Sequence, residues 1–254
     1  MDNDDRQIGR ILSRRDALKL LGITGAALLA ACAPEGSEMT EPASVSVSPT
    51  ISAVATSALP ACVVRPEVTE GPYYVDEELN RSDIRSDPTS GVAKQGALLA
   101  LTFNVSQISE AGCIPLEGAK VEIWHCDADG VYSDVSDPGF NTEGQKFLRG
   151  YQVTDANGQA TFLTIYPGWY SGRTIHIHFK VNENTSDSGR VFTSQLFFDD
   201  SFTDQVFTQE PYASKGQRNT LNSNDNIYQD ELLLDVAQSS DGYAAAFDIG
   251  LQLD

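Results

Sequence analysis

Short runs of alternating apolar and polar residues, separated by turn residues, extend along most of the chain. Runs of this kind that are rich in β-branched and aromatic side chains predict strands. The predicted strands are Leu98–Val105, Ala119–Cys126, Phe147–Val153, Gln159–Ile165, Thr174–Val181, Val191–Phe198, Glu231–Val236 and Tyr243–Leu251. Helical periodicity is limited to a turn or two at Thr203–Thr208. Short strands without crossover helices predict an all-β fold, an antiparallel β-sandwich with long loops and little helix.

The first 32 residues have the features of an export signal rather than of a folded segment. A twin-arginine pattern fills Ser13–Lys19, although Ala17 stands where an aromatic residue would strengthen it. The apolar run Leu20–Ala31 is too short to span a bilayer as a stable helix. It ends at Cys32 after small residues, which resembles a bacterial lipoprotein signal; the alternative is a Sec signal cut nearby, with Cys32 incidental.

Both interpretations of this segment place the mature protein outside the cytoplasm, periplasmic or at the cell surface. The lipoprotein interpretation adds membrane attachment through a lipid on Cys32. Twin-arginine export moves folded proteins, which suits a domain that acquires a metal before it leaves the cell.

Residues 33–61 are rich in Ser, Thr, Ala and Pro and contain no aromatic side chain. Such a segment cannot bury enough apolar surface to offset its ordering entropy. We interpret it as a disordered tether with a reach of about 30 Å; the alternative is a poorly packed first strand around 45–54. Residues 62–254 then form one domain, long enough for a sizeable core.

The chain is strongly acidic, with 17 basic and 36 acidic residues and a formal net charge of −19. This charge argues against nucleic acid or an anionic membrane surface as a partner.

Three cysteines remain in the predicted domain, and an oxidising compartment favours one disulfide and one free thiol. Cys113 and Cys126 flank a strand of about seven residues, which separates its ends by about 23 Å. We therefore expect Cys62 to pair with one of these two, and the choice between them stays open.

Two of the three histidines lie one residue apart in the predicted strand Thr174–Val181. His176 and His178 point to the same face of a strand, as half of a metal site or as a packed pair. His125 is a further candidate ligand, equally well explained by burial in the sheet. Tyr132 and Tyr170 are the other nearby donors, although each alone is also typical of a core residue with a wet hydroxyl. A phenol has a pKa near ~10, so a phenolate at neutral pH requires a strongly Lewis-acidic ion, which favours Fe(III) over Zn(II) or Mg(II).

Several sequence blocks resemble those of the intradiol ring-cleavage dioxygenases, the family of protocatechuate 3,4-dioxygenase and catechol 1,2-dioxygenase, and especially their secreted single-chain relatives. The resemblance runs from about Cys62 to Gly250. The blocks are Glu70–Tyr74, Val121–Ser133, Phe147–Gly150, Tyr166–Phe179 and Ser194–Phe198. The family implies a transthyretin-like (prealbumin-like) sandwich and a non-haem Fe(III). Its implied metal ligands are Tyr132, Tyr170, His176 and His178, with a hydroxide.

The resemblance also implies roles for residues beside the metal. Arg173 matches an arginine placed beside the substrate ring, and Gln195 matches a glutamine near the open coordination face. Tyr73 or Tyr74 matches the segment that lines the substrate mouth, and Trp169 is a candidate pocket wall. The implied reaction inserts both atoms of O2 into a catechol and opens the ring between the two hydroxylated carbons. The product is a cis,cis-muconic acid derivative.

Two other functions fit the same residues. One is an extracellular transthyretin-like binding module without iron, and the other is a copper or zinc hydrolase that uses the histidines. The hydrolase lacks a Glu or Asp close by in sequence as a general base. The sequence leaves the identity of the catechol, the oligomeric state and the membrane face open. It also lacks the helical N-terminal dimerisation segment of the cytoplasmic catechol enzymes, so their quaternary structure is not carried over.

Overall fold

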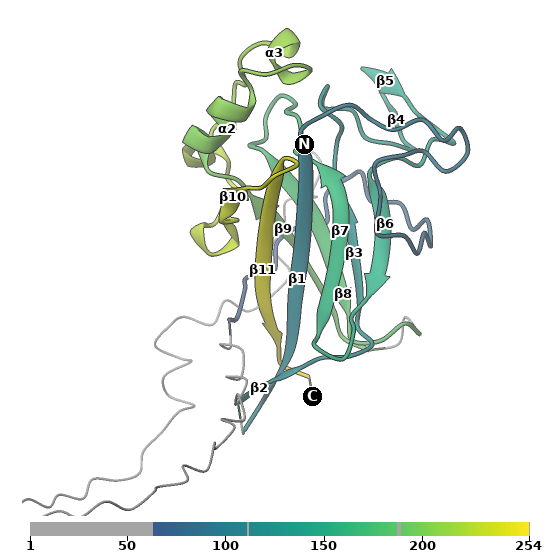
Figure 1. The fold of residues 1–254 in the computed structure, drawn as a ribbon, viewed down its shortest axis with the longest axis vertical. Coiled ribbons are helices and arrows are strands. Elements are labelled where there is room, and N and C mark those ends of the chain that lie inside the picture. Colours follow the sequence, from purple (N-terminus) through teal and green to yellow (C-terminus); the bar gives the residue numbers. More distant parts are fainter. Residues whose placement is uncertain (1–62, 111, 187–188, 254) are drawn as a thin grey trace, which may run out of the picture. The chain divides into compact units, whose positions relative to one another are not determined.

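Two β-sheets pack against each other in the computed structural model of the chain (Figure 1). The structure describes residues 63–110, 112–186 and 189–253, which belong to one contact unit. The predicted signal segment 1–32, the predicted tether 33–61 and Cys62 lie outside the described residues. The predicted all-β sandwich with little helix is confirmed.

The first sheet is centred on a long strand, β1. Its members are β1 (Leu98–Ser109), β2 (Gly112–Pro115), β7 (Gln159–Ile165), β10 (Val236–Gln238) and β11 (Tyr243–Leu251). β1 pairs antiparallel with β2 and β7 but parallel with β11. The prediction of antiparallel pairing is wrong at this one pair. Because β1 and β11 come from opposite ends of the domain, no hairpin imposes an antiparallel arrangement on them.

The second sheet has the order β6-β3-β8-β9 and is antiparallel throughout. Its strands are β3 (Lys120–Trp124), β6 (Arg149–Val153), β8 (His176–Asn182) and β9 (Val191–Phe197). A small hairpin of β4 (Ser136–Asp137) and β5 (Phe140–Asn141) lies in the long loop between β3 and β6. This second sheet carries most of the candidate site.

In the part of the chain that the structure describes, helical structure is confined to short segments, and α2 and α3 lie at one end of the sandwich (Figure 1). The segments are α2 (Asp200–Val206), α3 (Tyr212–Lys215) and the 3₁₀ turns η1 (Asn222–Asn224) and η2 (Asp230–Leu232). Among the described residues, none of these helices has the length and apolar character needed to cross a bilayer.

The predicted strand Glu231–Val236 is wrong. Most of it is the turn η2 followed by extended chain, and only its last residue belongs to β10. Leu232 and Leu234 are nevertheless buried, and Leu233 forms a single bridge with Phe197. The run of three leucines therefore reflects packing against the core and not a strand.

Aromatic side chains from both sheets meet in the core. Phe179 of β8 lies 5.2 Å from Phe103 of β1 and 5.5 Å from Phe247 of β11, measured between ring centroids. All three are almost fully buried. Burial of one such side chain stabilises the fold by about 1.5–3 kcal/mol. The apolar face of β8 is therefore fixed against the first sheet.

Cys113 is disulfide-bonded, whereas Cys126 is free and buried. This confirms the prediction that the two are not paired with each other; the predicted pairing with Cys62 involves a residue outside the described ranges. Burial raises the pKa of the Cys126 thiol to about 12, so the thiol is protonated at neutral pH.

Candidate metal centre

Strand β8 divides its side chains between the two faces of the second sheet. Ile177 and Phe179 point into the apolar core. Because side chains alternate along a strand, His176 and His178 point to the opposite face. There His178 stacks on Trp124 of β3, with ring centroids 5.1 Å apart and an angle of 7° between the planes. The sheet thus fixes the orientation of both imidazoles.

Four predicted ligand side chains converge at this face. Nε2 of His176 lies 3.1 Å from Nε2 of His178, 3.3 Å from Oη of Tyr132 and 3.2 Å from Oη of Tyr170. Tyr132 and both histidines are almost completely buried, and Tyr170 is partly buried. The structure therefore brings two imidazole nitrogens and two phenol oxygens together around one point.

Two glycines allow the loops that carry the tyrosines to approach each other. A Cβ atom on Gly130 would lie 2.1 Å from the carbonyl oxygen of Trp169, and one on Gly168 would lie 2.3 Å from the carbonyl oxygen of Ala128. Both distances are far below a van der Waals contact, so only glycine fits. The loop after β3 and the loop before β8 consequently lie backbone against backbone, and each delivers one tyrosine.

Hydrogen bonding sets the state of the His176 ring. Its Nδ1 lies 2.7 Å from the carbonyl oxygen of Thr174, which only accepts, so Nδ1 carries the proton. Nε2 is then left with a free lone pair directed at the tyrosines and His178. A ring oriented in this way by a backbone carbonyl is typical of a metal-binding histidine.

Burial keeps all four groups uncharged in the absence of a cation. It raises the pKa of Tyr132 and Tyr170 far above the ordinary phenol value and lowers the pKa of His176 and His178 well below the imidazole value. The positive charge of Arg173 opposes the rise at both tyrosines. A bound trivalent cation is the kind of charge that converts such phenols to phenolates.

The donor set fits iron better than zinc or copper. Within the described part of the chain, no three His, Cys, Asp or Glu side chains are grouped so that they could hold a metal. A metal held by all four converging atoms would take two of its ligands from the tyrosines, and phenolate ligation suits a hard, strongly acidic ion such as Fe(III). The residues present fit that ion.

His125 does not belong to this group. Its Nδ1 lies 2.8 Å from the carbonyl oxygen of Cys126, and its Nε2 lies 2.7 Å from Oγ1 of Thr164. The ring is fully buried with both nitrogens engaged. The structure agrees with the alternative in which His125 packs within the sheet.

Arg173 and Gln195 lie next to each other, as their predicted roles require. Nη2 of Arg173 donates to Oε1 of Gln195 at 2.6 Å, and Nε2 of Gln195 donates to the carbonyl oxygen of Thr69 at 2.8 Å. Gln195 is fully buried and pairs in register with His178. The hydrogen bond to Gln195 thereby holds the guanidinium of Arg173 next to the residue that pairs with His178.

Sequence reasoning missed Asp225. Its Oδ2 accepts from Nε of Arg173 at 2.9 Å and from the backbone N–H of Thr174 at 2.8 Å. The side chain of Asp225 is 1% exposed. No spacing or motif connects this aspartate with a residue 52 positions earlier, so the sequence carried no signal for it.

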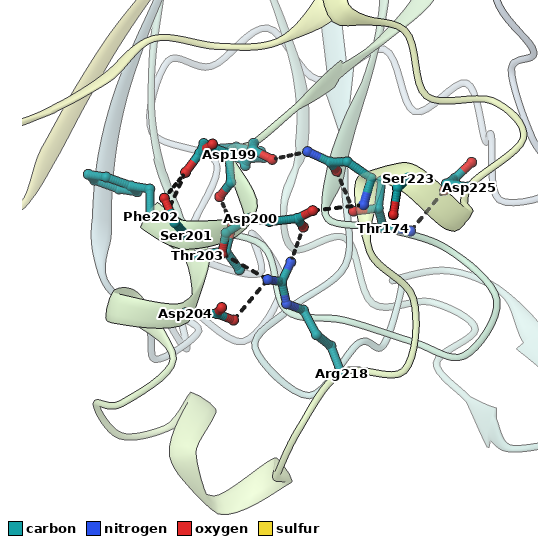
Figure 2. Close-up of polar contacts among 12 residues, drawn as sticks. Thr174, Asp199, Asp200, Ser201, Phe202, Thr203, Asp204, Arg218, Ser223 and Asp225 are labelled. Atoms are coloured by element: carbon teal, nitrogen blue, oxygen red, sulfur yellow. Dashed lines mark hydrogen bonds and ion pairs between the residues drawn. The ribbon is translucent and has the colours of Figure 1, made fainter.

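A polar network extends from Thr174 to helix α2, and Figure 2 shows Arg218 beside Asp200 and Asp204, with Thr174 and Asp225 in the same set of contacts. Oγ1 of Thr174 donates to Oδ1 of Asn222 at 2.6 Å. The backbone N–H of Asn222 donates to Oδ2 of Asp200, which also accepts through Oδ1 from Arg218. The N–H, hydroxyl and carbonyl of Thr174 are all engaged, and the carbonyl is the one that orients His176.

A pocket of about 450 Å³ adjoins the four converging side chains. Tyr170 lines it together with Tyr73 and Trp169. The ring of Tyr73 also stacks on Tyr132, with centroids 4.5 Å apart and an angle of 23°. A second pocket, of about 490 Å³, lies between α2 and β10 and is lined by none of the four candidate ligands.

Tyr74 does not line the pocket, in contrast to its predicted role at the substrate mouth. Its Oη donates to Oε2 of Glu122 at 3.2 Å, and Nζ of Lys180 lies 3.3 Å from its ring centroid. Tyr73 lies in a turn and its ring lines the pocket, whereas the ring of Tyr74 packs against Trp124. The structure places Tyr73 at the pocket.

Comparison with known proteins agrees with this architecture. A family model described as Dioxygenase matches residues 69–253. The chain is 34% identical over 155 residues to catechol 1,2-dioxygenase of Acinetobacter baylyi, covering 52% of this chain and 45% of that protein. It is 31% identical over 155 residues to the protocatechuate 3,4-dioxygenase β chain of Burkholderia cepacia, covering 57% of this chain and 65% of that protein.

Among solved structures, the chain is similar to an intradiol ring-cleavage dioxygenase from Tetranychus urticae. The TM-score is 0.66 at 31% sequence identity, covering 75% of this chain and 95% of that structure. The chain spans about half the length of the catechol 1,2-dioxygenase that it matches.

The sandwich, with two tyrosines and two histidines grouped beside a pocket, agrees with a ring-cleaving dioxygenase of the intradiol type. The chain belongs to the intradiol dioxygenase family.

Proposed function

We propose that the protein is a non-haem Fe(III) intradiol dioxygenase. It converts a catechol and one O2 into a cis,cis-muconic acid derivative. The bond between the two hydroxylated carbons breaks, each of these carbons gains one oxygen atom from O2, and the four electrons that O2 accepts come from the ring. The observation that carries this proposal is the convergence of Tyr132, Tyr170, His176 and His178 beside a pocket.

Nε2 of His176 and His178 and Oη of Tyr132 and Tyr170 would hold the iron. Iron held there would supply Lewis acidity that favours the phenolate form of the tyrosines and the deprotonated form of a catechol. The carbonyl of Thr174 keeps the His176 ring in the tautomer that this role needs.

Tyr170 is the ligand suited to exchange with substrate. It is the least buried of the four and the only one that lines the pocket. A catechol that enters the pocket can pass a proton to the Tyr170 oxygen, which then leaves room for a substrate oxygen. Tyr132 is enclosed beneath Tyr73 and remains fixed.

Arg173 supplies a fixed positive charge beside the ring. Two partners hold its guanidinium, Asp225 at Nε and Gln195 at Nη2. A charge that is already oriented stabilises developing anionic character on the substrate without reorganisation during the reaction.

The test is purification of the full chain, followed by measurement of iron content, visible absorption and O2 uptake with catechols. We expect about one iron per chain, a tyrosinate-to-iron charge-transfer band, and O2 uptake that yields a muconate spectrum. A colourless, iron-free protein with full activity would contradict the iron assignment. Coloured, iron-loaded protein that cleaves no catechol would contradict the reaction.

We also propose that the protein is exported by the twin-arginine route and anchored by a lipid on Cys32. The support is the sequence of residues 1–32. We expect Cys32→Ser to release the protein from the membrane fraction and to abolish labelling with radioactive palmitate. Replacing Arg14 and Arg15 by lysine should retain the precursor in the cytoplasm. Export of the lysine variant at the normal rate would contradict the route.

A further inference from the structure

The pocket beside Tyr170 is the place where a substituent on the substrate ring would lie. Tyr170 stands between the other candidate ligands and the pocket, and Tyr73 and Trp169 form its aromatic walls. A catechol whose two oxygens lay at the centre in place of the Tyr170 oxygen would direct the carbons far from those oxygens toward this pocket. The charges on the pocket wall then decide which substituents fit.

Two carboxylates line the pocket, Asp137 and Asp129. Asp137 is fixed, since its Oδ1 accepts from the backbone N–H of Gly139 and its Oδ2 accepts from Oη of Tyr73, both at 2.9 Å. The Tyr73 hydroxyl thus links this carboxylate to the aromatic wall. Asp129 lies on the exposed side of the same pocket.

One cation, Lys215, also lines the pocket, but its ammonium is engaged in the wall. Nζ of Lys215 donates to the backbone carbonyls of Asp129 and Trp169 and lies 4.8 Å from the Trp169 ring centroid. These contacts hold the ammonium on the Trp169 side of the pocket. With two carboxylates and one ammonium, the lining has a net charge of −1, and the whole chain carries −19.

The aromatic walls add to the preference that these charges create. Tyr73, Phe140 and Trp169 all line the pocket, and the Tyr73 and Phe140 rings lie 6.4 Å apart. An ammonium group is attracted to the face of such rings, whereas a carboxylate is not. An ammonium at the end of a short side chain would satisfy both the carboxylates and the rings.

We propose that the pocket selects catechols whose ring bears a cationic, ammonium-terminated side chain, over neutral and anionic catechols. This inference rests on the proposed dioxygenase function. The recognition elements are the carboxylates of Asp137 and Asp129 and the ring of Tyr73.

The kinetic test compares kcat/KM for three catechols of similar size. They are 4-(2-aminoethyl)catechol, 4-propylcatechol and 3-(3,4-dihydroxyphenyl)propanoate. We expect the aminoethyl compound to exceed the neutral compound by roughly fivefold or more, with the carboxylate last. The ratio of kcat/KM for the aminoethyl compound to kcat/KM for the neutral compound should decline toward one at high salt, because exposed charges are screened.

Substitution of the wall identifies the group responsible. Asp137→Asn should lower the ratio of kcat/KM for the ammonium catechol to kcat/KM for the neutral catechol by roughly fivefold. Asp241→Asn makes the same change in net charge in an exposed turn outside the pocket and should leave the ratio unchanged. Equal turnover of the three catechols, or a preference for the carboxylate that Lys215→Gln removes, would overturn the inference.

A binding test separates this inference from the proposed reaction. Metal-free protein is titrated with 4-(2-aminoethyl)phenol, 4-propylphenol and 3-(4-hydroxyphenyl)propanoate while Trp fluorescence is recorded. We expect the ammonium compound to bind most tightly, and Asp137→Asn to remove its advantage. If this charge preference appears but no catechol is cleaved, only the proposed function fails. If catechols are cleaved without charge preference in either test, only the inference fails.

Discussion

Asp225 accepts a hydrogen bond from Nε of Arg173 at 2.9 Å, although the two residues lie 52 positions apart in the chain. The same carboxylate oxygen also accepts from the N–H of Thr174. One buried acid thus fixes the cation beside the site and the residue whose carbonyl orients His176.

Asp225→Asn should impair catalysis more than it impairs folding. The amide has no negative charge, so it holds the guanidinium of Arg173 less firmly. Loss of one charge-assisted hydrogen bond is expected to lower kcat by about tenfold to a hundredfold. Iron content should be unchanged, because the residue touches none of the four converging donor atoms. Wild-type kcat in an iron-loaded Asp225→Asn protein would refute this positioning role.

Tyr132→Phe and Tyr170→Phe should differ in their effects. Each removes one phenolate, so the charge-transfer absorption should weaken in both variants. Tyr170→Phe also removes the proton acceptor at the pocket, and kcat is expected to fall by about a hundredfold or more. Stopped-flow absorption during anaerobic catechol binding checks the exchange: if substrate displaces Tyr170, the variant lacks the spectral change that accompanies its release.

Gly130→Ala should separate backbone strain from steric conflict. Gly130 has φ +76° and a Cβ there would lie 2.1 Å from the Trp169 carbonyl oxygen, whereas Gly118 has φ +84° and nothing within 4 Å of a Cβ. Gly118→Ala should therefore lower the free energy of unfolding by about 1–2 kcal/mol, the cost of a positive φ at a residue with a Cβ. Gly130→Ala should cost a further 1–3 kcal/mol or so and reduce iron content. Equal urea midpoints for the two variants would contradict the close approach of the loops.

Glu122 should make the protein less stable as the pH rises. Burial raises the pKa of this carboxyl from 4.5 to about 7 in the folded state. The folded state therefore binds more protons than the unfolded state between these values, and the stabilisation is complete below pH 4.5 and lost as the pH passes 7. In Glu122→Gln, the fall in the free energy of unfolding between the two pH values should be smaller by about 1–3 kcal/mol. Urea unfolding of the wild type and of Glu122→Gln at pH 5 and 7.5 measures this free energy. The same change between the two pH values in both proteins would show that Glu122 does not titrate in this range.

The sequence was sufficient for features that depend on local pattern. Alternation in Thr174–Val181 predicted that His176 and His178 share a face, and the structure agrees because burial of Ile177 and Phe179 fixes the strand's orientation. The two tyrosines were candidates as nearby donors, and the resemblance combined them with the histidines as one ligand set, since nothing in the spacing of Tyr132 alone connects it with β8. Their meeting point depends on the contact between the loops at Gly130 and Gly168.

Features that depend on long-range contacts were missed. Asp225 and Arg173 meet only after the chain has passed through β8, β9 and α2, and an isolated aspartate in a polar stretch has no distinguishing pattern. The strand predicted at Glu231–Val236 failed for the same reason. Its three consecutive leucines pack on the core from a turn and the residues that follow it, and a short apolar run does not by itself distinguish this packing from a strand.

Strand β8 has core residues on one face and imidazoles on the other. Because side chains alternate with a period of two, a slip of one residue in its pairing would direct His176 and His178 into the apolar interior and Ile177 outward. Burial of imidazoles among apolar side chains without hydrogen-bond partners is unfavourable, so the hydrophobic core disfavours a one-residue slip of β8. The apolar side chains of β8 thus help to set the register of a strand whose opposite face carries the two candidate histidine ligands.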